Sequence, residues 1–240
     1  TGAVFTTPGG GYTCTVNDTV FVKGTLAGPN SFRLMSSAMI NDGNVSFVNF
    51  YFASNTTSPT SFHTLKGTGS FTTSSCQITE GASVKLLSDH QFKYLTLNAG
   101  SILDLNSKTL KLNGSGTALS VSGTMLTAGS TIEYNGTAVQ NFPQANVNYE
   151  NVKFNDTAGV VLVDNVSVTG LIEVTNGDVN LNGKIFTLLA NATLSETPGN
   201  TFTGTSGYLV TTRNINAPNN LNVGGLGALI TSSSNLGLTE

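Results

Sequence analysis

Only 10% of the residues in this 240-residue chain are charged, against about 25% in typical soluble domains. Its polar surface is therefore expected to consist mostly of amide and hydroxyl groups. A formal charge of −3 with dispersed Lys and Arg provides no basic stripe for phosphates, which argues against a nucleic-acid partner. No apolar run approaches the roughly 20 residues of a membrane span, so we expect no membrane insertion, and Thr1 opens no signal peptide. Two cysteines, many amides and few lysines favour an extracellular setting for a mature form or an excised piece.

The first 80 residues contain strand-like segments at irregular spacing. Segments 12–16, 20–26 and 45–52 are rich in β-branched and aromatic residues, whereas 54–69 (SNTTSPTSFHTLKGTG) is typical of a protruding loop. We therefore expect an early coil with an insertion or an end cap in this part of the chain.

The two cysteines, Cys14 and Cys76, each share a strand face with apolar neighbours, so both side chains should point inward. Two or three coils between them correspond to about 10 to 14 Å. A disulfide needs Cα atoms within roughly 7 Å, so separate buried thiols are predicted, with a bridge as the alternative.

From residue 84 onward, pairs of the form apolar-x-apolar recur between Gly, Asn and Ser, and almost nothing has a helical pattern. Asn-Gly follows such pairs at Asn113, Asn135 and Asn182. Residues 119–136 match 166–183 without a gap, at an offset of 47 residues between Gly136 and Gly183. Self-similarity at a period of about 20 to 50 residues indicates a stacked architecture.

The apolar pairs group in order into three ladders that advance by a mean of about 24 residues per coil. Three short strands per coil, each bonded to its counterpart one coil away, predict an all-β, right-handed parallel β-helix (β-solenoid) over residues 1–200. Gly, Asn, Pro and Ser become dense after Thr197, which favours a C-terminal cap, or a junction to a following module, over 201–240. The predicted ladders are Val84/Leu86, Leu110/Leu112, Ile132/Tyr134, Val152/Phe154 and Val179/Leu181; Leu95/Leu97, Leu119/Val121, a weak step near Val139, Val161/Val163 and Phe186/Leu188; and Leu103/Leu105, Met125/Thr127, Val147/Tyr149, Ile172/Val174 and Ala192/Leu194.

Asparagines after the first ladder are expected to stack at one corner, where Asn tolerates a left-handed backbone and its amide can bond to the next one. The alternative interpretation of Asn-Gly is a two-residue hairpin turn, which would give a pair of antiparallel sandwiches. Hairpins need no fixed coil length, whereas the ungapped offset does, so we favour the solenoid. The stacked residues would be Asn113, Asn135, Asn155 and Asn182.

The outward positions of the first ladder place Lys111, Glu133 and Lys153 in successive coils, which predicts a solvated column of alternating charge. Asp104 and Glu173 fall on the third ladder, three coils or about 14 Å apart. Glycoside hydrolysis needs two acids about 5 to 9.5 Å apart, so we predict no catalytic residue and no enzymatic activity.

No cofactor or metal site is predicted either. His63 in the candidate loop and His90 at a corner lack acidic or cysteine neighbours at ligand spacing, and both are expected to be solvated. No calcium-loop spacing recurs in the chain.

Aromatic residues concentrate near the candidate loop, and Tyr51, Phe62 and His63 are the residues we would expect to contact a glycan. The alternative is that the same side chains pack the loop onto the solenoid.

The segments 163–188 (VDNVSVTGLIEVTNGDVNLNGKIFTL), 130–159 (STIEYNGTAVQNFPQANVNYENVKFNDTAG) and 221–237 (LNVGGLGALITSSSNLG) resemble the repeat-rich secreted surface proteins of Bacteroidetes. This resemblance implies export by the type IX route, display at the cell surface and a place in a longer adhesin-like protein. Asp18-Thr19-Val20 and Asp156-Thr157-Ala158 resemble the short acceptor motif for O-linked glycans in that phylum, which implies modification of Thr19 and Thr157.

We therefore expect a non-enzymatic structural or adhesive module of an extracellular cell-surface protein, acting as a β-helical spacer or attachment element. Its expected partners are surface glycans, or other copies or modules of the same protein. The alternative is a carbohydrate-binding or polysaccharide-degrading β-helix.

Overall fold

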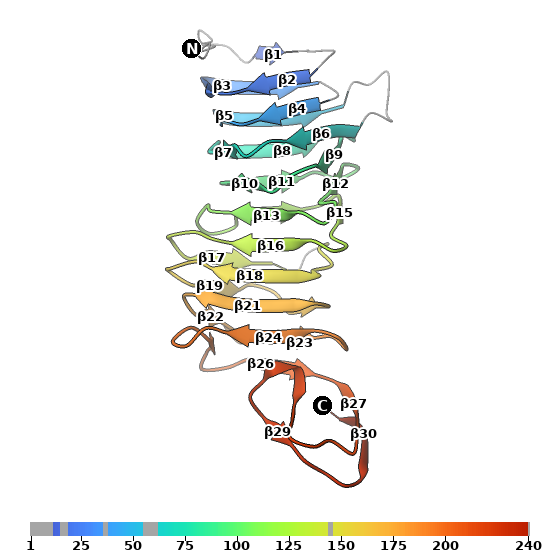
Figure 1. Ribbon diagram of the computed structural model, residues 1–240. Helices are drawn as coiled ribbons and strands as arrows, with labels where there is room; N and C mark the ends of the chain where they lie inside the picture. Colours follow the sequence, from blue (N-terminus) through green and yellow to red (C-terminus); the bar gives the residue numbers. More distant parts are fainter. Residues whose placement is uncertain (1–11, 15–18, 36–37, 55–61, 144–145, 240) are drawn as a thin grey trace.

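The computed structural model describes residues 12–14, 19–35, 38–54, 62–143 and 146–239, and within them the chain forms a β-solenoid of about nine turns (Figure 1). The front strands in Figure 1 run to the left while the chain descends, which makes the coil right-handed. The described strands before residue 212 pair in parallel. The predicted parallel β-helix is confirmed, and the alternative of antiparallel sandwiches is wrong.

The strands are short because a turn residue interrupts the chain every few positions. In chain order they are β1 (Tyr12–Cys14), β2 (Thr19–Val22), β3 (Thr25–Leu34), β4 (Ala38–Asn41), β5 (Asn44–Ala53), β6 (Phe62–Lys66), β7 (Ser70–Phe71), β8 (Ser75–Thr79), β9 (Ser83–Leu86), β10 (His90–Phe92), β11 (Leu95–Leu97), β12 (Ile102–Asp104), β13 (Thr109–Leu112), β14 (Leu119–Val121), β15 (Thr124–Leu126), β16 (Thr131–Tyr134), β17 (Gln140–Phe142), β18 (Asn151–Asn155), β19 (Val160–Leu162), β20 (Val166–Val168), β21 (Leu171–Asn176), β22 (Val179–Asn180), β23 (Ile185–Leu188), β24 (Thr193–Glu196), β25 (Phe202–Thr203), β26 (Tyr208–Thr211), β27 (Arg213–Asn216), β28 (Leu221–Asn222), the 3-10 turn η1 (Val223–Gly225), β29 (Leu229–Ile230) and β30 (Asn235–Thr239).

One sheet runs through the middle of the rod in the order β7, β10, β13, β16, β18, β21, β24. Along it Leu110 pairs with Ile132, Ile132 with Val152, Val152 with Ile172, and Ile172 with Leu194, so each coil takes 20 or 22 residues. These coils are slightly shorter than the mean of 24 expected from the sequence. Beyond β7 the same sheet continues through β5, β8, β11 and β14, and β3 and β1 join it at β5. Three other parallel sheets cover the remaining sides: β15-β12-β9-β6-β4-β2, β17-β19-β22-β25 and β20-β23-β26.

The predicted ladders are right in the centre of the chain, where Leu95 pairs with Leu119, Leu103 with Met125 and Leu110 with Ile132. They are wrong towards the ends. Val84 pairs with Leu103 instead of Leu110, and Val179 pairs with Val160 in a different sheet. Alternation specifies which side of a strand faces inward, but all three sides of a coil alternate alike, so an uneven loop shifts the assignment to a neighbouring sheet.

The ungapped repeat at offset 47 does not coincide with the coil register. Adding the offset to Ile132 gives Val179, whereas the residue stacked two coils beyond Ile132 is Ile172. The repeat therefore predicts the stacked architecture correctly, but it aligns residues of one sheet with residues of a neighbouring sheet.

The core is a column of side chains from alternate strand positions, with an aromatic cluster towards each end and leucines between. Phe71 stacks on Phe92 at 4.7 Å between ring centroids, and Phe142 lies 4.6 Å from Tyr149. In β19 the inward residues are Val160 and Leu162, so the prediction that Val161 and Val163 point inward is wrong. The leucines include Leu95, Leu97, Leu103, Leu105, Leu110, Leu112 and Leu119, each at most 1% exposed.

The asparagine corner is only partly as predicted. Asn113 and Asn135 follow β13 and β16, and Asn155 ends β18 in the next coil, but Asn182 follows β22 on another side. No amide ladder forms, because Asn135 Nδ2 donates to Gln91 Oε1 at 3.2 Å and Asn155 Nδ2 donates to Glu133 Oε1 at 2.9 Å. Of the four predicted corner residues, Asn182 has the left-handed backbone, with φ of 49°.

The N-terminal part is more regular than expected. Residues 62–66 of the predicted loop form β6, which pairs with β4 and β9, and 55–61 lie outside the described residues. Cys76 is a buried free thiol, and its register partner Phe50 belongs to β5. The side chain of Cys14, in β1 of the same sheet, lies outside the described residues.

The C-terminal end leaves the solenoid later than residue 200, because β25 and β26 still pair in parallel with β22 and β23. Beyond them, β27 pairs with β30 and β28 with β29, both antiparallel (Figure 1). The turn η1 lies against β24, and the guanidinium of Arg213 donates to the carbonyl of Ala192. A Cβ at Gly225 would lie 2.0 Å from the carbonyl oxygen of Leu194, so this backbone packs directly on the last coil of the middle sheet.

Candidate functional site

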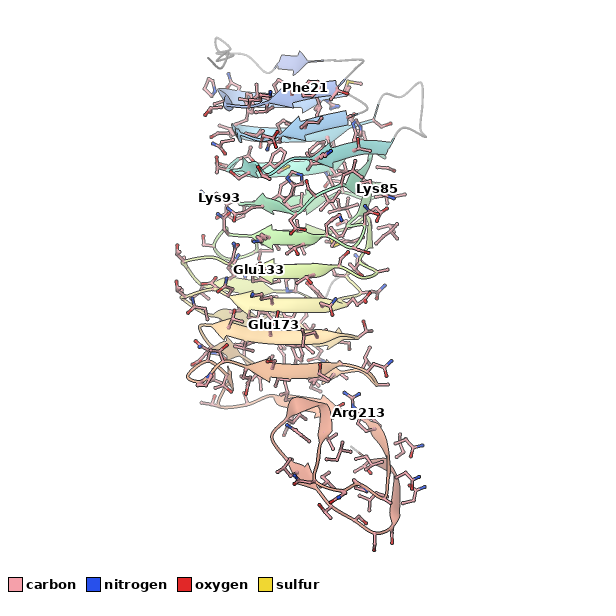
Figure 2. All side chains as sticks on the ribbon, in the orientation of Figure 1. Phe21, Lys85, Lys93, Glu133, Glu173 and Arg213 are labelled. Atoms are coloured by element: carbon pink, nitrogen blue, oxygen red, sulfur yellow. The ribbon has the colours of Figure 1, made fainter. Side chains whose placement is uncertain are left out.

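A column of polar side chains follows the outer face of the middle sheet. The predicted register of Lys111, Glu133 and Lys153 is confirmed, with Lys111 Nζ 3.7 Å from Glu133 Oε2. The prediction that the whole column is solvated is wrong, because Glu133 is only 7% exposed. Figure 2 shows Glu133 and Glu173 on the same face of the rod. In register order the column holds Ser70, Gln91, Lys111, Glu133, Lys153, Glu173 and Ser195.

The place predicted for Glu173 is wrong, because it pairs with Lys153 in this column instead of sharing a ladder with Asp104. Its nearest acid in the column is Glu133, two coils or about 9.6 Å away. That separation is near the upper end of the range for inverting glycosidases, but Lys153 lies between the two acids in the register. The arrangement therefore alternates charges along the rod rather than directing two acids at one bond.

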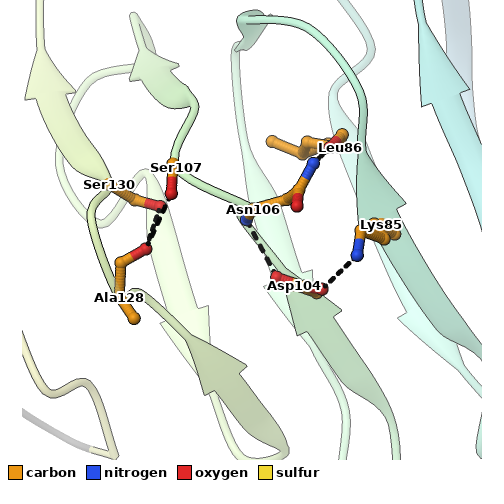
Figure 3. A network of polar contacts seen from close by, with 7 residues as sticks. All are labelled: Lys85, Leu86, Asp104, Asn106, Ser107, Ala128 and Ser130. Atoms are coloured by element: carbon orange, nitrogen blue, oxygen red, sulfur yellow. Dashed lines mark hydrogen bonds and ion pairs between the residues drawn. The ribbon is translucent and has the colours of Figure 1, made fainter.

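Asp104 belongs to a local network on another side of the solenoid (Figure 3). One carboxylate oxygen lies 3.4 Å from Lys85 Nζ, and the other accepts the backbone N–H of Asn106 at 2.8 Å. The side chain of Asn106 in turn donates to the carbonyl of Leu86, one coil away, at 2.9 Å. Because both oxygens of Asp104 are engaged in holding a turn, this acid has a structural role.

A polar groove of about 540 Å³ lies at the N-terminal end of the column, across the coils of β7, β10 and β13. Its row of outward side chains is Ser70, Gln91 and Lys111, which are register partners. We call this feature the β10 groove. It is lined by Gly67, Thr68, Gly69, Ser70, Ser88, Asp89, His90, Gln91 and Lys111.

His90 lines the β10 groove but is only 2% exposed, so the prediction that it is solvated is wrong. Burial lowers the pKa of His90 from 6.5 to about 4, while nearby backbone groups of Gly69 and Leu65 act in the opposite direction. The imidazole is therefore neutral at pH 7.

Ser88 lies 3.3 Å from Nε2 of His90, but the pair is not arranged as a nucleophile and base. The hydroxyl of Ser88 donates its one proton to the carbonyl of Gly67 at 2.7 Å, so the imidazole can only donate to the serine oxygen. An activated serine needs the opposite polarity, with the hydroxyl donating to the ring.

Of the residues predicted to contact a glycan, Tyr51 and His63 belong to different sheets and do not form a common site. Tyr51, in β5, is half-buried and lies beside Arg33, whose guanidinium is 6.0 Å from the ring centroid and forms an ion pair with Glu80. His63, in β6, is 3% exposed, with Nε2 3.0 Å from the carbonyl of Ala53, so its predicted solvation is wrong as well. Phe62 also belongs to β6, and its side chain lies outside the described residues.

The two threonines of the glycan-acceptor motifs lie several coils apart along the solenoid. Thr19 begins β2 and is half-buried, and Thr157 is exposed in the turn after β18. Modification of either threonine stays a prediction.

Asp156, the neighbour of Thr157, is a buried acid that the sequence did not predict. Its side chain is fully buried, and Oδ1 accepts the N–H of Ala158 at 2.9 Å. Oδ2 has no hydrogen-bond partner among the described residues. Burial raises the pKa of Asp156 above its ordinary value of 3.8, against the backbone N–H groups of Ala158 and Gly159. An Asp in a turn motif gives no sequence signal for this burial.

Within the described residues, no three His, Cys, Asp or Glu side chains converge as metal ligands, and no helix has the length and apolarity to cross a membrane. Burial raises the pKa of the Cys76 thiol, which removes its nucleophilic character at neutral pH.

No protein-family model, curated protein or solved structure matches the chain.

Proposed function

We propose that this chain is a non-enzymatic structural and adhesive module of an extracellular cell-surface protein, acting as a β-solenoid spacer or attachment element. The observation that carries the proposal is the unbroken middle sheet from β7 to β24, with a buried column inside and a column of alternating charge outside. Such a rod extends by about 4.8 Å per coil and keeps its backbone hydrogen bonds parallel to its axis. This is a suitable design for holding a binding surface away from a cell.

The surface location rests on two further points, the low charge content and the segments that resemble secreted Bacteroidetes proteins. We propose type IX export and O-glycosylation of Thr19 and Thr157 on the same basis. Intact mass and peptide mapping of protein recovered from its own host test the modification. Additional hexose mass on the Thr157 peptide, lost in Thr157→Ala, is expected, and an unmodified peptide contradicts it.

Deletion of the module from the full-length protein tests the adhesive role. We expect cells to lose attachment to their surface while the remaining protein is still displayed, as measured with an antibody to another part of the chain. A shorter rod gives a graded version of this test. Removing 131–150 takes out one coil, because Thr131 and Asn151 are register partners. Undiminished attachment after deletion of the whole module contradicts the proposal.

The second candidate function is a carbohydrate-binding or polysaccharide-degrading β-helix, favoured by the β10 groove and by Glu133 and Glu173 in one column. Release of reducing ends from a panel of polysaccharides separates degradation from binding. Turnover that disappears in Glu133→Gln or Glu173→Gln, with the thermal midpoint unchanged, would replace the non-enzymatic proposal.

A further inference from the structure

We infer that the β10 groove is a binding site for a linear, uncharged glycan that lies along the solenoid axis. This inference deepens the adhesive part of the proposed function by naming a site and a ligand class.

The shape of the groove fits an extended chain molecule. Ser70, Gln91 and Lys111 are register partners in three successive coils, so they form a row with steps of about 4.8 Å. The volume of about 540 Å³ is within the range of about 300 to 1,000 Å³ seen for ligand pockets. One rim of the groove carries no side chain at Gly67 and Gly69. A Cβ there would lie 2.1 Å (Gly67) or 2.3 Å (Gly69) from a backbone oxygen of the preceding coil.

The lining chemistry selects a ligand rich in hydroxyl groups. Besides glycines, the groove is lined by residues that carry hydroxyl, carboxylate, imidazole, amide and ammonium groups, and no described Ala, Val, Leu, Ile, Met, Phe or Tyr lines it. An apolar ligand would desolvate these polar groups without replacing their hydrogen bonds to water. Planar carboxylate and amide groups can instead bind pairs of neighbouring hydroxyls.

Part of the hydrogen-bonding capacity in the row is free. One oxygen of Asp89 accepts the N–H of Thr109 at 2.8 Å, and Oε1 of Gln91 accepts from Asn135. The other carboxylate oxygen of Asp89 and Nε2 of Gln91 make no further hydrogen bond to a described residue. Lys111 is 3.7 Å from Glu133, a distance that leaves its ammonium protons available.

The charges argue for an uncharged ligand. Asp89 carries one negative charge, Lys111 one positive charge, and the pKa of about 4 keeps His90 neutral at pH 7. The lining therefore has no net charge, and it provides no attraction for a polyanion such as a nucleic acid or a sulfated polymer.

A peptide strand is a poorer fit than a glycan. A peptide that adds to a sheet needs an edge with free backbone groups, but β10 is already paired with β7 on one side and β13 on the other. A peptide bound by its side chains needs apolar pockets, which the β10 groove lacks. The absence of an aromatic platform from the lining also means that the expected affinity for a short glycan is weak.

The test is an amide chemical-shift titration of the whole chain with cellotetraose, xylotetraose and mannotetraose, and with tetragalacturonate as a charged probe. We expect at least one neutral probe to shift the amides of 67–70, 88–91 and 111. Lys111→Met and Gln91→Ala should weaken that binding at least tenfold. Lys153→Met is the matched control, because Lys153 stands in the same column but outside the groove, and we expect it to change the affinity less than twofold.

Three outcomes overturn the inference: no neutral probe shifts the groove amides, tetragalacturonate binds more tightly than every neutral probe, or Lys153→Met weakens binding as much as Lys111→Met. Failure of this site is distinguishable from failure of the adhesive function. Loss of attachment on deleting the module, with no response in the titration, rejects only the site. Glycan binding with undiminished attachment after deletion rejects only the adhesive role.

Discussion

The solenoid coils and the antiparallel strands after residue 212 contain similar apolar residues, but the coils bury them and the antiparallel strands leave most of them exposed. In the coils, Leu110, Phe154 and Ile172 are 0% exposed. In the strands after residue 212, Leu229 is 61% and Leu238 77% exposed, and Ile215 is the one large apolar side chain among 213–239 that is buried.

The difference comes from the number of neighbours that each strand has. An interior coil strand pairs on both sides, and its inner face meets two other sheets across the core. β27 with β30, and β28 with β29, are isolated two-stranded pairs, which are marginally stable in water on their own. The C-terminal strands therefore depend on their contact with the last coil, through η1 and Arg213.

The largest expected effect separates the two regions directly. Phe154→Ala should lower the free energy of unfolding by about 3 to 5 kcal/mol, because it removes a fully buried ring and leaves a cavity. Leu238→Ala should change it by less than about 0.5 kcal/mol, because that side chain is exposed. Urea unfolding monitored by circular dichroism measures both, and equal effects would contradict the contrast in packing.

Acid should act on the coils, since Arg213 is the only ionisable side chain in 213–239. The folded pKa of His90, about 4, lies below its ordinary value of 6.5, so the unfolded chain takes up the proton first as pH falls. Stability from this residue is complete above pH 6.5 and decreases towards pH 4, by about 3 kcal/mol. His90→Gln should flatten the pH dependence of the unfolding free energy between pH 6.5 and 4, and an unchanged slope would reject the burial of a neutral ring.

The junction between the regions can be broken at Gly225. Its φ is 80° and a Cβ there would collide with the backbone of Leu194, so Gly225→Ala should cost about 1 to 3 kcal/mol and expose β24 to hydrogen exchange. Gly227→Ala is the control, because Gly227 has a similar φ of 78° with no atom within 4 Å of the added Cβ. If both variants leave the protection of β24 unchanged, η1 does not cover the last coil.

The smallest effect concerns the unpaired oxygen of Asp156 inside the coils. Its folded pKa is raised above 3.8, so the folded state holds the proton longer, and the contribution to stability is lost as pH rises through the folded pKa. Asp156→Asn keeps the acceptor for Ala158 and removes the buried charge. We expect a gain of about 1 kcal/mol at pH 7 and none at pH 3, by thermal unfolding at both values. A loss of stability at pH 7 would mean that Oδ2 has a partner.

Local patterns predicted much of this molecule. The stacked parallel fold, the inward direction of Leu110 and Ile132, and the charge column from Lys111 to Lys153 follow from alternation with a period of two. The candidate glycan residues were not predictable in the same way. Tyr51 and His63 are close in sequence, but they belong to different sheets on different sides of the coil.

The sequence by itself determined the class of fold, because short β-branched strands between Gly and Asn turns have few other ways to bury their apolar side. Only the tertiary structure decided which strands stack, because the three sides of a coil carry the same alternation and loop lengths shift one against another. It also decided that His90 is buried and that Ser70, Gln91 and Lys111 share one groove. These residues are about 20 positions apart, and they meet because each complete circuit of the chain returns to the same side of the rod.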